Sequence, residues 1–177
     1  MEDTFTTTIG RWRDFESLVG AAAATLLGLL FVAASLRPAA FNPTNNPDHP
    51  DLLSIGLDTM IMFLLAIAIA LVLLIPNITP IGLGMSLMIL ALFSLTQNVR
   101  HFIASQRMIR HEWGAWFFTR RVILPGFGYI LLIVIGISVM TGQNWGLSAL
   151  GGLQLLFLFT GTYNAWSLLT RVGKSQH

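Results

Sequence analysis

The sequence contains no cysteine among its 177 residues. Disulfide bonds, thiolate metal sites and cysteine nucleophiles are therefore excluded. Charged residues are also scarce, because Asp, Glu, Lys and Arg make up 10% of the chain, against about 25% in globular proteins. The formal net charge of +2 is too small to indicate a nucleic-acid partner.

Apolar residues dominate what is present. Hydrophobic residues make up 54% of the chain, and its mean hydropathy is +0.71. A soluble fold with so few charges could not cover that much apolar surface. The apolar residues also form stretches long enough to cross a hydrocarbon core of about 30 Å. We therefore predict an all-α, polytopic membrane protein with about five transmembrane helices in one domain.

The predicted spans are separated by prolines, turn formers or polar residues. They cover residues 15–36, 52–75, 81–96, 122–140 and 146–169. Residues 1–14 form a polar lead, and its acidic start argues against a secretory signal. Residues 171–177 form a polar tail. An odd number of spans places the two ends of the chain on opposite sides of the membrane.

Residues 97–121 form the main polar interruption in the second half of the chain. This basic segment holds half of the Lys and Arg residues, namely Arg100, Arg107, Arg110, Arg120 and Arg121. Its apolar residues gather on one side of a helical projection. That pattern predicts an amphipathic helix in the membrane interface, with Arg107 and Arg110 near anionic lipid headgroups. The alternative is a stem that prolongs the third span beyond the membrane.

The distribution of basic residues predicts the orientation. With the N-terminus outside, the cytoplasmic side holds Arg37, the basic segment, Arg171 and Lys174, and only Arg11 and Arg13 lie outside. Positively charged residues favour the cytoplasmic side, so we expect the N-terminus outside and the C-terminus in the cytoplasm. Aromatic residues near the ends of the spans are expected to anchor the interface: Trp12, Trp113, Trp116, Trp145, Tyr163 and Trp166.

Small residues mark one face of the first span. Gly20, Ala24 and Gly28 fall four positions apart and so share one side of a helix. Small residues at this spacing let a second helix approach closely in lipid. The first interpretation is packing against a neighbouring helix of the same chain, and the second is self-association.

Asp58 is the carboxylate expected deepest in an apolar span. An Asp at a helix centre costs roughly 3 kcal/mol on insertion scales, which the surrounding Leu, Ile and Phe residues outweigh. In the predicted orientation it lies about 9 Å along the second span, on the side of Arg37, Arg100, Arg120 and Arg121. A structural ion pair with one of these arginines is one interpretation. A coupling or permeation carboxylate is the other.

The run from Phe15 to Leu36, FESLVGAAAATLLGLLFVAASL, resembles the start of a group of small, uncharacterised bacterial membrane proteins. The resemblance covers the first predicted span, and beyond it extends only to hydropathy. It implies a bacterial inner (cytoplasmic) membrane setting. It carries no activity and no functional residue.

The sequence favours two functional hypotheses of different classes. The spans contain no histidine and no paired acids, so we predict no enzyme, no metal site and no cofactor. The first hypothesis is an accessory or structural subunit of a larger membrane complex, which fits the short loops and the small-residue face. The alternative is a homo-oligomeric ion channel or small transporter with Asp58 lining the pathway. The expected partners are the lipid bilayer and either other membrane subunits or further copies of the chain.

Overall fold

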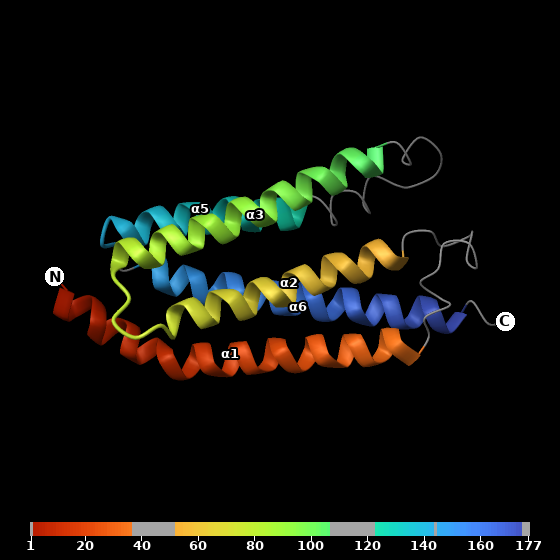
Figure 1. Cartoon of the computed structure of the whole chain (residues 1–177), viewed down its shortest axis with the longest axis horizontal. Coiled ribbons are helices and arrows are strands. Elements are labelled where there is room, and N and C mark those ends of the chain that lie inside the picture. Colours follow the sequence, from red (N-terminus) through yellow and green to blue (C-terminus); the bar gives the residue numbers. More distant parts are fainter. Residues whose placement is uncertain (1, 37–51, 107–122, 144, 175–177) are drawn as a thin grey trace. The chain divides into compact units, whose positions relative to one another are not determined.

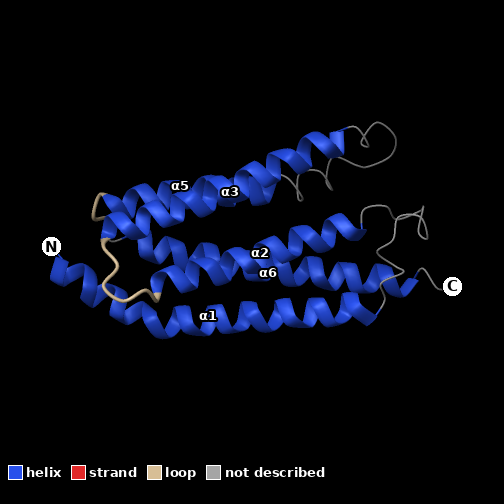
Figure 2. Ribbon diagram, in the orientation of Figure 1, coloured by secondary structure: helices blue, strands red, loops and turns tan. Residues whose placement is uncertain are grey.

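The computed structural model describes residues 2–36, 52–106, 123–143 and 145–174. These residues form five helices and contain no strand (Figure 1 and Figure 2). The helices are α1 (Glu2–Leu36), α2 (Leu52–Leu73), α3 (Pro80–Gln106), α5 (Leu124–Met140) and α6 (Trp145–Lys174). The predicted all-α class is confirmed.

Four of the described helices are long and apolar enough to cross a membrane. The qualifying segments are Ile9–Leu36, Ile55–Leu73, Pro80–Arg100 and Trp145–Thr170. The fifth helix, α5, is apolar but has only 17 described residues, about 26 Å at 1.5 Å per residue and near the lower limit for a span. The apolar helices are therefore compatible with an integral membrane protein, and a count of five spans depends on α5.

Two helices extend beyond the predicted spans. The lead does not form a separate segment, because α1 begins at Glu2 and runs for 35 residues, about 52 Å against a hydrocarbon core of about 30 Å. Likewise, α3 continues to Gln106 instead of ending at residue 96. No Pro or Gly lies between residues 97 and 106 to end it. Residues 97–106 therefore prolong α3, as the stem alternative predicts. Residues 107–122 lie outside the described residues, so the interfacial helix over the whole basic segment stays a prediction.

Local signals explain where α2 ends and α3 begins. The connecting turn contains Asn77 with a φ of 55°, a left-handed conformation that Asn adopts more readily than most residues. Thr79 Oγ1 accepts a hydrogen bond from the Gly82 N–H at 3.1 Å, which is the N-cap interaction. Pro80 then occupies the first helical position, where its missing N–H costs nothing.

The end of α5 is a Schellman motif. The Gly142 N–H donates to the Val139 carbonyl at 3.1 Å, and the Gln143 N–H donates to the Ser138 carbonyl at 3.0 Å. Gly142 has a φ of 74°, a conformation that favours glycine because a Cβ would clash there. The glycine therefore explains why the chain reverses direction between α5 and α6.

The chain divides into two compact units. Unit 1 comprises Met1–Gly10 and Ile75–Leu153, and unit 2 comprises Arg11–Leu74 and Gln154–His177. In unit 1, α3 and α5 lie side by side and run antiparallel (Figure 1). In unit 2, α1 and α6 run in the same direction and α2 runs in the opposite one (Figure 1).

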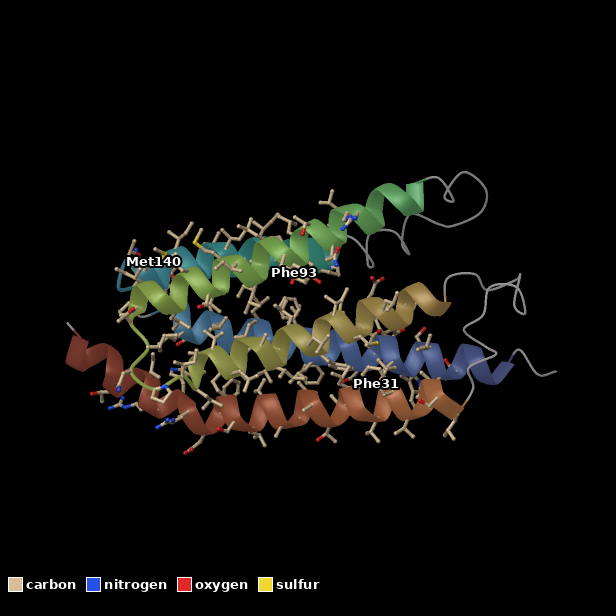
Figure 3. All side chains as sticks on the ribbon, viewed as in Figure 1. Phe31, Phe93 and Met140 are labelled. Carbon is tan, nitrogen blue, oxygen red and sulfur yellow. The ribbon has the colours of Figure 1, made fainter. Side chains whose placement is uncertain are left out.

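In unit 1, glycines allow the backbones of α3 and α5 to come into contact. A Cβ added to Gly84 of α3 would lie 2.6 Å from the Gly136 carbonyl oxygen of α5 and would also overlap Met140. A Cβ added to Gly136 would lie 3.0 Å from the Gly84 carbonyl oxygen. Met140 lies near the end of α5 (Figure 3). This contact is the close helix approach that small residues allow in lipid.

The core of unit 2 forms where its three helices meet. Leu30 of α1, Ile55 and Phe63 of α2, and Leu168 of α6 make one buried cluster. Gly161 of α6 lies against Phe63, because a Cβ added there would stand 2.7 Å from the ring atom Cε1. The faces turned away from this core remain apolar, as shown by Phe31, which is 50% exposed (Figure 3).

Candidate functional site

A polar pair is buried among the apolar helices of unit 2. The side chain of Glu16 on α1 is 2% exposed, and that of Gln154 on α6 is 0% exposed. Gln154 Nε2 donates a hydrogen bond to Glu16 Oε2 at 2.7 Å. Asp14, Glu16 and Asp58 are the acidic residues whose side-chain burial the structure describes, and of these only Glu16 is buried.

Helical spacing places both residues on core faces. Glu16 is followed at intervals of three or four residues by Val19 and Ala23, which are also buried. Gln154 is followed at the same intervals by the buried residues Phe157 and Gly161. Both polar side chains therefore project from the faces that build the core of unit 2, and neither faces the surrounding solvent or lipid.

The Gln154 side chain is only partly satisfied. Its Oε1 atom is buried and has no hydrogen-bond partner within the described residues. By contrast, the buried hydroxyl of Thr59 donates to the Ile55 carbonyl at 2.8 Å, and that of Ser138 donates to the Ile135 carbonyl at 2.9 Å. Most buried polar atoms have a partner, so Gln154 Oε1 marks a place where a hydrogen-bond donor is required.

Neither α2 nor residues 145–170 of α6 place a cation beside Glu16. Between Trp145 and Thr170, α6 contains no Asp, Glu, Lys, Arg or His. The only charged residue of α2 is Asp58. On α1 the neighbouring charged residues Arg13 and Asp14 are exposed. The pair is therefore a carboxyl and an amide in apolar surroundings, an arrangement suited to holding a proton or a hydrogen bond.

The sequence placed the main intramembrane carboxylate at Asp58. The structure leaves Asp58 partly buried on α2, in unit 2. Of its candidate partners, Arg100 is exposed and belongs to unit 1, while Arg37, Arg120 and Arg121 lie outside the described residues. The ion pair of Asp58 stays a prediction. Glu16 is a buried carboxylate that was not predicted from the sequence.

The small-residue face of α1 is divided between two environments. Gly20 packs within unit 2, because a Cβ added to it would stand 3.1 Å from the Ala70 Cβ of α2. Ala24 and Gly28 are exposed instead, and a Cβ added to Gly28 would meet nothing within 4 Å. Gly20 therefore contacts a neighbouring helix of the same chain, while the side of α1 that bears Ala24 and Gly28 is exposed within the described residues.

The predicted interface anchors are accessible where the structure describes them. Trp12 packs edge-on against Phe15 with ring centroids 5.4 Å apart. Trp145, Tyr163 and Trp166 are exposed, and the Trp145 Nε1–H donates to Gln143 Oε1. Trp113, Trp116, Arg107 and Arg110 lie outside the described residues.

No protein-family model, curated protein or solved structure matches the chain. The resemblance to small bacterial membrane proteins therefore stays a prediction. Within the ranges that the structure describes, no group of three His, Cys, Asp or Glu residues is arranged to hold a metal ion. The features of the described residues that bear on function are therefore the packing of the helices and their buried polar atoms.

Proposed function

We propose that this chain is an accessory subunit that contributes transmembrane helices, and no catalysis of its own, to a larger complex in a bacterial cytoplasmic membrane. One observation carries the proposal, namely the uncovered part of the small-residue face of α1. Ala24 and Gly28 are exposed there, and the space around Gly28 is open to 4 Å.

This surface suits a transmembrane helix of a different subunit. Ala21 and Thr25 are also exposed on this side of α1, so its profile remains low beside Ala24 and Gly28. The Thr25 hydroxyl donates a hydrogen bond to the Ala21 carbonyl at 2.8 Å. It is therefore not free to donate to a partner helix. Helix association in lipid depends on close van der Waals packing, for which such a surface is shaped.

Replacing Gly28 with leucine is expected to remove the partner subunit without unfolding the chain. Among the described residues, the Cβ of the new side chain meets no neighbouring atom within 4 Å, but the leucine would hold an approaching helix away. The measurement is copurification from native membranes, with stoichiometry determined by mass spectrometry. Gly152→Leu is the matched control, because Gly152 of α6 is equally open and its substitution should leave the complex intact.

The mass of the detergent-solubilised chain expressed alone separates the two functional classes. The accessory proposal expects a chain that forms no discrete symmetric oligomer. A stable homo-oligomer that conducts ions in liposomes, with the flux lost in Asp58→Asn, would contradict it and favour the channel. Retention of every copurifying subunit by Gly28→Leu would also count against the proposal.

The proposed orientation has the N-terminus outside and the C-terminus in the cytoplasm. The chain has no native cysteine, so single-cysteine variants can be labelled without background. Gln143→Cys, in the exposed turn after α5, should react with a membrane-impermeant maleimide added to intact cells. Thr170→Cys, exposed near the opposite end of α6, should react only after permeabilisation. The reverse result would invert the orientation.

A further inference from the structure

The amide of Gln154 makes only one of the two hydrogen bonds that it can form with a carboxyl group. Its Nε2 donates to Glu16 Oε2 at 2.7 Å, while its Oε1 is buried without a partner in the described part of the chain. A carboxylic acid has an O–H to donate, whereas an ionised carboxylate can only accept. A protonated Glu16 therefore has an O–H of the kind that Gln154 Oε1 lacks.

We propose that Glu16 and Gln154 form a buried proton-binding site, in which the protonated Glu16 carboxyl donates to Gln154 Oε1 while Gln154 Nε2 donates back to Glu16. This cyclic pair satisfies both polar groups of the amide. Turning the Gln154 amide over does not provide an alternative, because the carboxylate still offers no donor to the oxygen.

A proton fits this site better than a metal ion. The two side chains supply at most three oxygen atoms, whereas hard cations such as Ca²⁺ take about 6–8 oxygen ligands. The charged groups nearest to Glu16 on its own helix, Arg13 and Asp14, are exposed. The helices packed against α1 in unit 2 carry three charged residues, all distant from the pair along their helices. Asp58 is twelve residues along α2 from Ala70, the residue that Gly20 faces, or about 18 Å. Arg171 and Lys174 of α6 are 17 and 20 residues from Gln154, or about 26 and 30 Å. Ionised Glu16 would thus lack a cation from α2 and from residues 145–170 of α6.

The position of Glu16 along α1 also indicates from which side of the membrane a proton reaches it. Trp12, the expected interface anchor, is one helical turn from Glu16, so the carboxyl lies about 6 Å further along α1. Arg11, Arg13 and Asp14, beside Trp12 on this turn of α1, are exposed. The site therefore exchanges its proton with the side of the membrane on which α1 begins, and it needs no partner subunit to do so.

Infrared spectroscopy of the full chain in lipid tests this site directly. At neutral pH we expect a carbonyl band of a protonated carboxylic acid that shifts in D₂O. The band should be lost in Glu16→Gln and kept in Asp58→Asn. It should also be kept in Glu112→Gln, which replaces the glutamate of the basic segment (residues 97–121). In Gln154→Leu it should move to higher frequency, because the carboxyl loses the amide partner.

Isotope labelling keeps the test valid even where a variant fails to fold. In the unaltered chain, carboxyl-¹³C glutamate should move the band, whereas carboxyl-¹³C aspartate should not. The absence of a protonated-carboxyl band at neutral pH would overturn the proposal. So would a band that follows aspartate labelling, or one that survives Glu16→Gln.

Discussion

Replacing Gly84 with alanine is expected to destabilise the packing of α3 on α5 by about 1–3 kcal/mol, the usual cost of overpacking. The added methyl group would lie 2.6 Å from the Gly136 carbonyl oxygen and would overlap Met140. A methionine side chain can move aside, but a backbone carbonyl in a helix cannot move without displacing α5. The favourable helix propensity of alanine, up to about 1 kcal/mol, offsets only part of this cost.

The loss should be measured as the free energy of unfolding in detergent micelles. Gly28→Ala is the matched control, because the same methyl group there meets nothing within 4 Å, and it should leave stability unchanged or slightly higher. Adding Met140→Ala to Gly84→Ala should not restore stability, since the clash with Gly136 remains. Equal stability of Gly84→Ala and Gly28→Ala would contradict the backbone contact.

Hydropathy and local turn chemistry predict the helices of this chain well. The apolar runs are long enough to span lipid, and Pro80 and Gly142 mark a helix start and a helix end where the structure has them. The outer ends were harder to predict. Polar residues of the lead and of residues 97–106 contain no helix breaker apart from Gly10, so α1 and α3 continue past the apolar boundary that hydropathy detects.

The candidate site could not be predicted, because sequence does not show how a membrane helix is rotated about its axis. In α1 the face bearing Glu16, Val19 and Ala23 is buried, and the face bearing Ala24 and Gly28 is exposed. Both faces are largely apolar, since positions that face lipid and positions that face the core both favour apolar side chains. Glu16 also lies close to the predicted start of the span, where a carboxylate would ordinarily reach water.

Two features of the sequence could have indicated that Glu16 is buried. One is its helical spacing from the apolar residues Val19 and Ala23, and the other is a polar residue on another apolar helix that could pair with it. Gln154 is the one Gln in an apolar stretch of α6, and it is 138 positions away along the chain. Pairing the two requires that α1 and α6 be neighbours in unit 2, which no local pattern encodes. Asp58 was predicted as the main intramembrane carboxylate because the depth of a residue along a span follows from its position in the sequence. Burial by neighbouring helices does not follow from the sequence in this way.

Replacing Gly161 with alanine is expected to destabilise unit 2 by about 1–3 kcal/mol, because the new methyl group would stand 2.7 Å from Cε1 and 3.1 Å from Cζ of Phe63. Phe63 is 0% exposed and belongs to the cluster that includes Leu30 and Leu168, so its ring cannot swing away without opening a cavity. The measurement is again the free energy of unfolding in micelles.

Unlike the clash at Gly84, this one involves a side chain, so a second substitution should relieve it. Phe63→Leu alone should destabilise the chain, by less than the roughly 3–5 kcal/mol of a Phe→Ala truncation. The double variant Gly161→Ala with Phe63→Leu should be more stable than the sum of the two single effects, by about 0.5–3 kcal/mol, the usual coupling of residues in contact. Strict additivity of the two effects would mean that α6 and Phe63 do not touch at Gly161. We expect Phe63→Leu to offset part of the stability lost in Gly161→Ala, and Met140→Ala not to restore the stability lost in Gly84→Ala. This difference would show that the glycine of unit 2 packs against a side chain, whereas the glycine of unit 1 packs against a backbone.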